Sequence, residues 1–237
     1  DITDADWGIY ASNVAGLSIV DSQIDGRTAA GRGTGSGIFV ENSNGAVIGA
    51  ASNDTNIIRD FQGHGVQLIN SDNALISYNT ISGVSQNGVY VDTSDNATVA
   101  NNTINADANG VLVISGSDHD VQFNTINGGV RGILLSGTAN NNNVVNNFIG
   151  QTTGTSWNSI EIFGNTGTTN VSNNDIDNAG WDGINVNSGT GFVTVQGNDI
   201  DNTTGASGIA FVFHNGDGLI NNNSIDGADR LGSYIGR

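Results

Sequence analysis

Five aspartates in the C-terminal third of the chain recur at a regular interval. They form two columns, one of Asp175, Asp199 and Ser224 and one of Asp177, Asp201 and Asp226. Each pair flanks an isoleucine that we expect to point inward, which would direct the carboxylates to solvent. Like charges about 5 Å apart repel unless a cation lies between them, and oxygen-only ligands suit Ca²⁺. The columns predict a calcium site, with a solvated acidic face or a catalytic carboxylate pair as the alternatives.

Tryptophan and arginine recur at one position of a repeat. Trp157 and Trp181 each precede a repeat start by two residues, and Arg131 directly precedes another start. We expect the three side chains to lie at one corner of neighbouring repeats. Exposed indoles stack on sugar rings, and an adjacent guanidinium binds hydroxyls or carboxylates. The pattern predicts a glycan-binding corner; the alternative is that the indoles only cover the core.

Catalytic residues are harder to identify. The candidates are His64, Arg131 and Asp182, which lie at repeat starts and have side chains suited to acid–base work. His64 lies between two glycines in the turn before a start, so its neighbours are explained by the repeat alone. His119 and His214 share no spacing that indicates a metal site or a catalytic triad.

The repeat that positions these residues begins with a small residue, a β-branched residue and alternating apolar side chains. The starts are Gly8, Gly37, Gly65, Gly88, Gly110, Gly132, Ser159, Gly183, Gly208 and Ser233, at intervals of 22 to 29 residues. Each repeat holds two or three strands too short to form a sheet alone, so they must pair with the next repeat. We therefore expect an all-β, single-domain parallel β-solenoid of nine to ten coils over residues 1–237.

A second motif, Asn-x-Ile, ends most repeats. Stacked about 4.8 Å apart, such amides can hydrogen-bond along the solenoid. The first two repeats place Ser22 and Arg59 at this position. The remaining members of the predicted ladder are Asn79, Asn102, Asn124, Asn147, Asn174, Asn198 and Asn223.

These repeats resemble the single-stranded right-handed parallel β-helix of the pectin-lyase-like superfamily, in a style similar to mannuronan C5-epimerase modules. The resemblance implies action on polysaccharides, but it marks a fold and not an activity. The epimerase signature Tyr-Gly-x-Asp-Pro-His cannot occur in a chain without Pro, and the absence of Lys excludes Lys-dependent lyases. Of the polygalacturonase motifs, only Gly63-His64-Gly65 is present.

Composition limits the partners. The net charge of −17 disfavours nucleic acid and anionic membranes, and no apolar run is long enough for a transmembrane segment. The first residues lack a signal peptide and the chain starts without Met, so we interpret it as a segment of a longer chain. Open solenoid ends expose strand edges, and we expect further segments or subunits to cap them.

Two classes of function remain. The first is an extracellular or cell-surface module, a rigid adhesin-like element that binds glycans or Ca²⁺. The alternative is a polysaccharide-modifying enzyme, a lyase, C5-epimerase or hydrolase acting on acidic polysaccharide. Missing signatures and dispersed candidates favour the first. The long inserts Gly26–Gly35 and Gly150–Asn158 are where we expect partners to bind.

Overall fold

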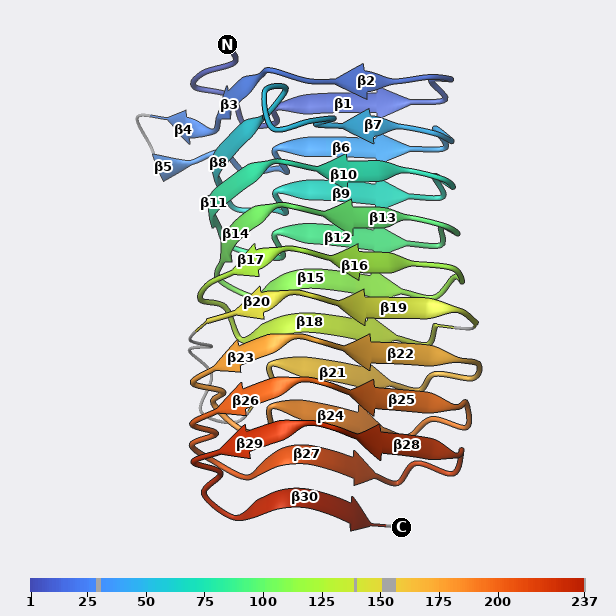
Figure 1. Cartoon of the computed structure of the whole chain (residues 1–237). Helices are drawn as coiled ribbons and strands as arrows, with labels where there is room; N and C mark the ends of the chain where they lie inside the picture. The colour runs from blue at the N-terminus through green and yellow to red at the C-terminus, as the bar shows by residue number, and fades with distance from the viewer. Residues whose placement is uncertain (29–30, 139, 151–156, 237) are drawn as a thin grey trace.

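Short strands wind into a solenoid whose coils stack along one axis (Figure 1). The computed structural model describes residues 1–28, 31–138, 140–150 and 157–236. Within these residues every regular element is a strand, and no helix is long and apolar enough to cross a membrane. The predicted inserts are therefore only partly described, since residues 29–30 and 151–156 fall outside these ranges.

Three parallel sheets form the walls. Sheet 1 contains ten strands, which in order are β1 (Ile9–Ser12), β6 (Ile38–Glu41), β9 (Val66–Ile69), β12 (Val89–Asp92), β15 (Asn109–Ile114), β18 (Arg131–Ser136), β21 (Ile160–Phe163), β24 (Ile184–Asn187), β27 (Ser207–Val212) and β30 (Leu231–Gly236). Sheet 2 contains nine strands, which are β2 (Ser18–Ile19), β7 (Val47–Ile48), β10 (Leu75–Ser77), β13 (Thr98–Ala100), β16 (Asp120–Gln122), β19 (Asn142–Val145), β22 (Thr169–Ser172), β25 (Val193–Gln196) and β28 (Gly218–Asn221).

Sheet 3 also contains nine strands, which are β3 (Gln23–Asp25), β8 (Ile57–Phe61), β11 (Thr80–Val84), β14 (Thr103–Ala106), β17 (Thr125–Ile126), β20 (Phe148–Ile149), β23 (Asp175–Asp177), β26 (Asp199–Asp201) and β29 (Ser224–Asp226). Each coil runs from sheet 1 to sheet 2 to sheet 3. The chain then turns from sheet 3 into sheet 1 of the next coil, and we call this turn the 3–1 corner. Nine coils and one further strand confirm the predicted solenoid.

The strand registers confirm the predicted repeat starts, with one exception. Ile9, Ile38 and Val66 are paired in neighbouring strands, each directly after a predicted start. In the last strand Ile209 pairs with Ser233, so the equivalent of Gly208 is Gly232 and the predicted start at Ser233 is wrong by one residue. The sequence Leu-Gly-Ser-Tyr-Ile-Gly offers two small residues in a row, which allowed both alignments.

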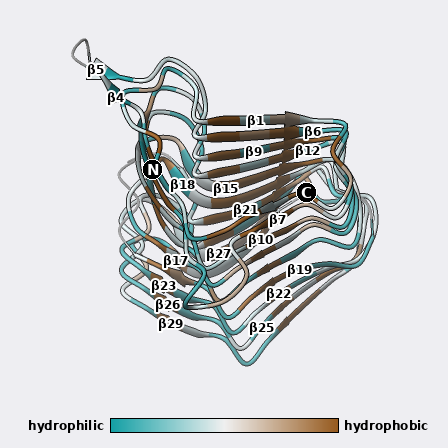
Figure 2. Cartoon of the chain, turned by 90° about the horizontal axis from the view of Figure 1, so that it is seen from above, coloured by the Kyte–Doolittle hydropathy of each residue, from teal (hydrophilic) through white to brown (hydrophobic). Residues whose placement is uncertain are grey.

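Alternation along the strands builds a thin core. In β12 the side chains of Val89 and Val91 are fully buried, while Tyr90 and Asp92, which alternate with them, remain partly exposed. The view along the axis shows apolar strands around the interior and hydrophilic residues at many of the corners (Figure 2). The last coil is less buried, and Ile235 is 74% exposed.

An asparagine ladder runs through the corner between sheets 2 and 3. Each amide donates from Nδ2 to Oδ1 of the asparagine in the next coil at 2.9–3.0 Å, from Asn56 through to Asn223. All seven predicted members take part, and Ser22 continues the column by donating its backbone N–H to Asn56. The prediction of Arg59 is wrong, because Asn56, three residues earlier, occupies the ladder position of the second coil, and Asn56-Ile57-Ile58 also fits the motif.

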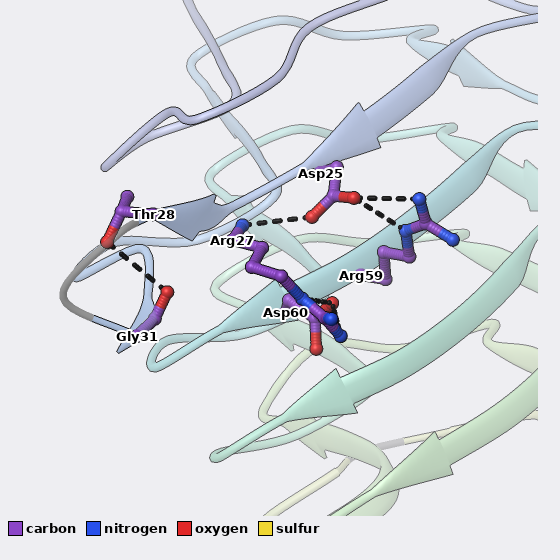
Figure 3. Close-up of polar contacts among 6 residues, drawn as sticks. All are labelled: Asp25, Arg27, Thr28, Gly31, Arg59 and Asp60. Carbon is purple, nitrogen blue, oxygen red and sulfur yellow. Dashed lines mark hydrogen bonds and ion pairs between the residues drawn. The ribbon is translucent and has the colours of Figure 1, made fainter.

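A short antiparallel hairpin of β4 (Arg27–Thr28) and β5 (Gly31–Arg32) projects from the first coil (Figure 1). The ion pair of Arg27 with Asp60, at 2.9 Å, holds the hairpin to β8, and beside it Arg59 of β8 pairs with Asp25 of β3 at 2.7 Å (Figure 3). Arg59 therefore forms an ion pair outside the ladder. Arg32 reaches Asp107, three coils along, at 2.7 Å, so the hairpin braces the 3–1 corner.

Candidate functional site

The side chains best suited to chemistry gather where the 3–1 corner enters sheet 1, in the later coils. Arg131 is the first residue of β18, Trp157 and Trp181 precede β21 and β24, and Arg230 precedes β30. Glu161 lies within β21 between Ile160 and Ile162, which are fully buried in the core, so its carboxylate is on the outer face. We call Arg131, Trp157, Glu161, Trp181, Asp182 and Arg230 the Arg–Trp cluster.

Arg131 joins an indole to a carboxylate. Its guanidinium carbon lies 3.9 Å from the centroid of the Trp157 ring, a cation–π contact. Its Nε donates to Oε2 of Glu161 at 2.6 Å. Glu161 is only 7% exposed although it lies on the outer face, while Trp157 keeps 44% of its surface exposed. One guanidinium thus fixes the indole and neutralises the carboxylate, leaving part of the ring open to a ligand.

Asp182 is the most buried carboxylate of the cluster, at 3% exposed. Its Oδ1 accepts the backbone N–H of Ser207 at 2.8 Å, and its Oδ2 accepts Nδ2 of Asn185 at 2.7 Å. Burial raises the pKa of Asp182, and the nearby charge of Glu161 adds to the rise, while these two hydrogen bonds and Arg230 oppose it. A carboxyl group with a raised pKa beside a second carboxylate is an arrangement that can donate a proton.

Trp181 forms a second pair of the same kind. The guanidinium carbon of Arg230 lies 5.4 Å from its ring centroid. A Cβ placed on Gly205 would lie 2.5 Å from Cε3 of the indole, so the ring packs directly on the glycine backbone. Trp157 and Trp181 precede neighbouring strands, which puts them at the same corner in adjacent coils. Each has its own arginine, whereas the sequence pattern offered only Arg131.

His64 lies apart from the cluster. It precedes β9, and β9 and β18 are separated by three strand intervals, or roughly 14 Å. Nδ1 of His64 accepts the backbone N–H of Asn87 at 3.3 Å, and the ring stacks on Tyr90 with centroids 4.7 Å apart. Of the three predicted catalytic candidates, the structure therefore places Arg131 and Asp182 in one cluster and His64 elsewhere.

The acidic columns lie on sheet 3. Asp175 pairs with Asp199 and then Ser224, and Asp177 pairs with Asp201 and then Asp226, as the repeat predicts. Burial raises the pKa of Asp175, and its acidic neighbours add to the rise. Across the described ranges, no three His, Asp or Glu side chains converge on a point that could hold a metal ion. The carboxylates lie side by side along the sheet, and the calcium site stays a prediction.

Sequence reasoning missed Glu161, Asn185 and Arg230. Glu161 carried a usable signal, because it is one of only two glutamates and stands at an outward position of a repeat start. The partner position in the next strand holds Asn185. Arg230 had no such signal. It lies at the repeat position that Trp181 occupies two coils earlier, but the predicted start at Ser233, wrong by one residue, placed it at a different position.

A family model described as right-handed β-helix region matches residues 2–149, more than half of the chain. No curated protein matches the chain in sequence. Among solved structures, the surface protein and adhesin PfbA of Streptococcus pneumoniae is similar, with 12% identity, a TM-score of 0.54, and coverage of 94% of this chain and 77% of its own.

Two further solved structures are similar to parts of the chain. The periplasmic alginate epimerase AlgG, as a T265N mutant, has 13% identity and a TM-score of 0.50, covering 97% of this chain and 70% of its own. The catalytic unit of a GH87 α-1,3-glucanase from Streptomyces thermodiastaticus has 15% identity and a TM-score of 0.47, covering 93% of this chain and 50% of its own. At these identities the likeness extends to the fold alone.

Proposed function

The chain belongs to the right-handed β-helix family, and we propose that it is a rigid glycan-binding module whose ligand lies on the Arg–Trp cluster. The observation that carries the proposal is the contact of Arg131 with Trp157, which holds a 44% exposed indole in a fixed orientation beside two carboxylates. An oriented aromatic face with hydrogen-bonding groups at its edge is what a pyranose ring requires.

The charge balance of the cluster favours a neutral glycan. Arg131 is paired with Glu161 at 2.6 Å, and Arg230 acts on the carboxylate of Asp182. The carboxylates of Glu161 and Asp182 thus offset the charge of the two guanidinium groups, and the whole chain carries a net charge of −17. An acidic polysaccharide would meet repulsion at long range and no excess positive charge at the cluster. The ligand class thus differs from the acidic polysaccharide that the enzyme alternative assumes.

The similar structures support a location outside the cytoplasm. PfbA is a surface protein and adhesin, and AlgG is a periplasmic epimerase. We propose that this chain also functions at the cell surface or in the extracellular space. A stack of coils that presents one face to a polysaccharide suits that setting, because a rigid rod orders the site before the ligand arrives.

Glycan titration tests the module directly. We expect neutral gluco-oligosaccharides to perturb tryptophan fluorescence. We expect Trp157→Ala to weaken binding roughly tenfold or more, as for an aromatic side chain that the bound ligand covers. Phe123→Ala is the matched control, because Phe123 is 54% exposed and lies at the corner between sheets 2 and 3. Equal or tighter binding of alginate or pectate, or no response to any neutral glycan, would contradict the proposal.

Glycoside hydrolysis is the second candidate, because Asp182 is buried, has a raised pKa and lies near Glu161. Glycosidases commonly use two carboxyl groups, one of which donates a proton to the leaving oxygen. The test is release of reducing ends from neutral glycans by the wild type but not by Asp182→Asn. Binding without release in either protein would leave the non-catalytic module, and ultraviolet-absorbing unsaturated products would instead indicate a lyase.

A further inference from the structure

Three aromatic side chains gather at the opposite end of sheet 1. The ring centroids of Trp7 and Phe39 are 6.2 Å apart, and those of Tyr10 and Phe39 are 5.3 Å apart. Trp7 is 52% exposed and Tyr10 is 59% exposed. We call Trp7, Tyr10 and Phe39, together with the adjoining Glu41, the aromatic platform.

The backbone places these rings on the outside of the solenoid. Tyr10 and Phe39 are register partners in β1 and β6, and the core beneath them is filled by Ile38 and Val40, both fully buried. A Cβ on Gly35 would lie 2.1 Å from Cδ2 of Trp7, so the indole packs against a glycine, as Trp181 packs on Gly205. The rings are thus held in place without contributing to the core.

A carboxylate borders the rings. The hydroxyl of Tyr10 donates to Oε1 of Glu41, and Ser12 also hydrogen-bonds this carboxylate. These hydrogen bonds lower the pKa of Glu41, so the group stays charged at neutral pH. An aromatic face beside a charged acceptor can take the C–H face of a sugar ring and one of its hydroxyl groups at the same time.

We propose that the aromatic platform is a second glycan subsite, which stacks a neutral pyranose. Glu41 and the net charge of −17 oppose an anionic membrane, a nucleic acid or an acidic sugar. The same charge opposes a second copy of the chain on this face, because the two copies would repel. A neutral polyhydroxylated ring meets neither objection.

The platform and the Arg–Trp cluster share one face. Six strand intervals separate β1 from β21, or roughly 29 Å. Between them the first outward residue is the polar Gln67, and the next three, Tyr90, Leu112 and Leu134, are half-buried and apolar. One extended glycan could therefore lie along sheet 1 and occupy both sites. The choice of ligand class rests on the proposed function, while occupancy of the platform is measured independently of it.

Fluorine NMR separates the two sites, because the chain has only three tryptophans, one in the platform and two in the cluster. Protein labelled with 5-fluorotryptophan is titrated with malto-, cello- and laminari-oligosaccharides of increasing length. Each resonance is assigned by a Trp→Phe substitution. We expect the Trp7 resonance to shift, and Tyr10→Ala to weaken that response tenfold or more while the Trp157 and Trp181 responses persist.

Each outcome is decisive for one site. If the Trp7 resonance does not shift while that of Trp157 or Trp181 does, the platform proposal fails and the proposed function stands. If only Trp7 responds, the platform stands and the cluster is not the glycan site. Phe123→Ala controls for loss of any exposed ring. Sedimentation velocity completes the test, since a dimer dispersed by Tyr10→Ala would make a second copy the occupant and overturn the proposal.

Discussion

At the scale of single residues, His64 shows how its position in the coil determines the chemistry of a side chain. It belongs to a second column of hydrogen bonds, next to sheet 1 and separate from the asparagine ladder. The backbone N–H of Asn87 donates to His64 Nδ1, and one coil later the N–H of Asn109 donates to Oδ1 of Asn87. The imidazole therefore serves as an acceptor where the next coil uses an amide. Burial lowers the pKa of His64 to about 4, which keeps the ring neutral.

This predicts a pH-dependent contribution to stability. Between pH 6.5 and about 4 the unfolded chain binds a proton at His64 that the folded chain does not, so stability falls as the pH falls through this window. In His64→Asn the amide oxygen can accept the same N–H without titrating. We expect the variant to match the wild type at pH 8 and to exceed it by roughly 1–3 kcal/mol at pH 4.

Urea denaturation of both proteins across this range measures the difference. His119, whose pKa is also lowered by burial, and the carboxylates remain in both proteins and cancel in the comparison. If the free energy of unfolding of the variant differs from that of the wild type by the same amount at pH 8 and pH 4, His64 does not have the lowered pKa that this prediction requires.

The sequence predicted individual site residues only where the repeat was aligned correctly. Trp157 and Arg131 could be placed together because their offsets from Ser159 and Gly132 are read directly from the chain. The contact of Arg230 with Trp181 depended on the register of the last strand, which two adjacent small residues left ambiguous. The burial of Asp182 depends on side chains from neighbouring coils, which spacing does not reveal.

At the scale of elements, the asparagine ladder is the most highly connected feature. Asn124 is 1% exposed and donates to Asn147 Oδ1 at 3.0 Å and to the carbonyl of Val99 at 2.8 Å. Its own Oδ1 accepts both the backbone N–H and the side-chain amide of Asn102 at 3.0 Å. Replacing this residue leaves buried polar groups on both sides without partners.

We therefore expect Asn124→Ala to destabilise the protein by roughly 2–4 kcal/mol, since each orphaned buried group costs about 1–3 kcal/mol. Asn140→Ala is the control, because Asn140 is exposed and lies outside the ladder. Thermal and urea denaturation measure both variants. Equal stability of the two variants would show that the ladder contributes little.

The ladder was predictable because its motif repeats with a constant offset to a buried isoleucine. Asn56 was missed although Asn56-Ile57-Ile58 fits the motif, because the long spacing of the first coils shifted the expected position to Arg59. The strand registers of sheet 1 were equally predictable. The hairpin of β4 and β5 was not, since its position depends on ion pairs between coils rather than on a local pattern.

At the scale of the whole molecule, the main electrostatic feature is the excess of acidic residues. The net charge is −17, and the acidic columns of sheet 3 add stacked carboxylates at neighbouring register positions. We propose that Ca²⁺ binds between them, as the sequence predicts. At Ca²⁺ tenfold above its Kd, the stabilisation is about 1.4 kcal/mol, which corresponds to a rise in Tm of about 3 °C or more.

The comparison is between Ca²⁺ and EDTA at matched ionic strength, with Mg²⁺ as the control for screening. Asp199→Asn combined with Asp201→Asn should abolish the Ca²⁺-specific rise. The same variant should melt above the wild type in EDTA, because it relieves like-charge repulsion. An unchanged Tm on addition of Ca²⁺ would end the calcium proposal.

Because each strand of the three sheets pairs only with its equivalents in the adjacent coils, the protein behaves as a one-dimensional array of coupled units. Partners along the chain are mostly 22 to 29 residues apart, so folding spreads from one coil to the next in the manner of a zipper. Since the coupling is between neighbours, the opening of one coil first weakens the coils on either side of it. The aromatic platform and the Arg–Trp cluster, with six strand intervals between β1 and β21, would therefore loosen separately under heat or mechanical tension.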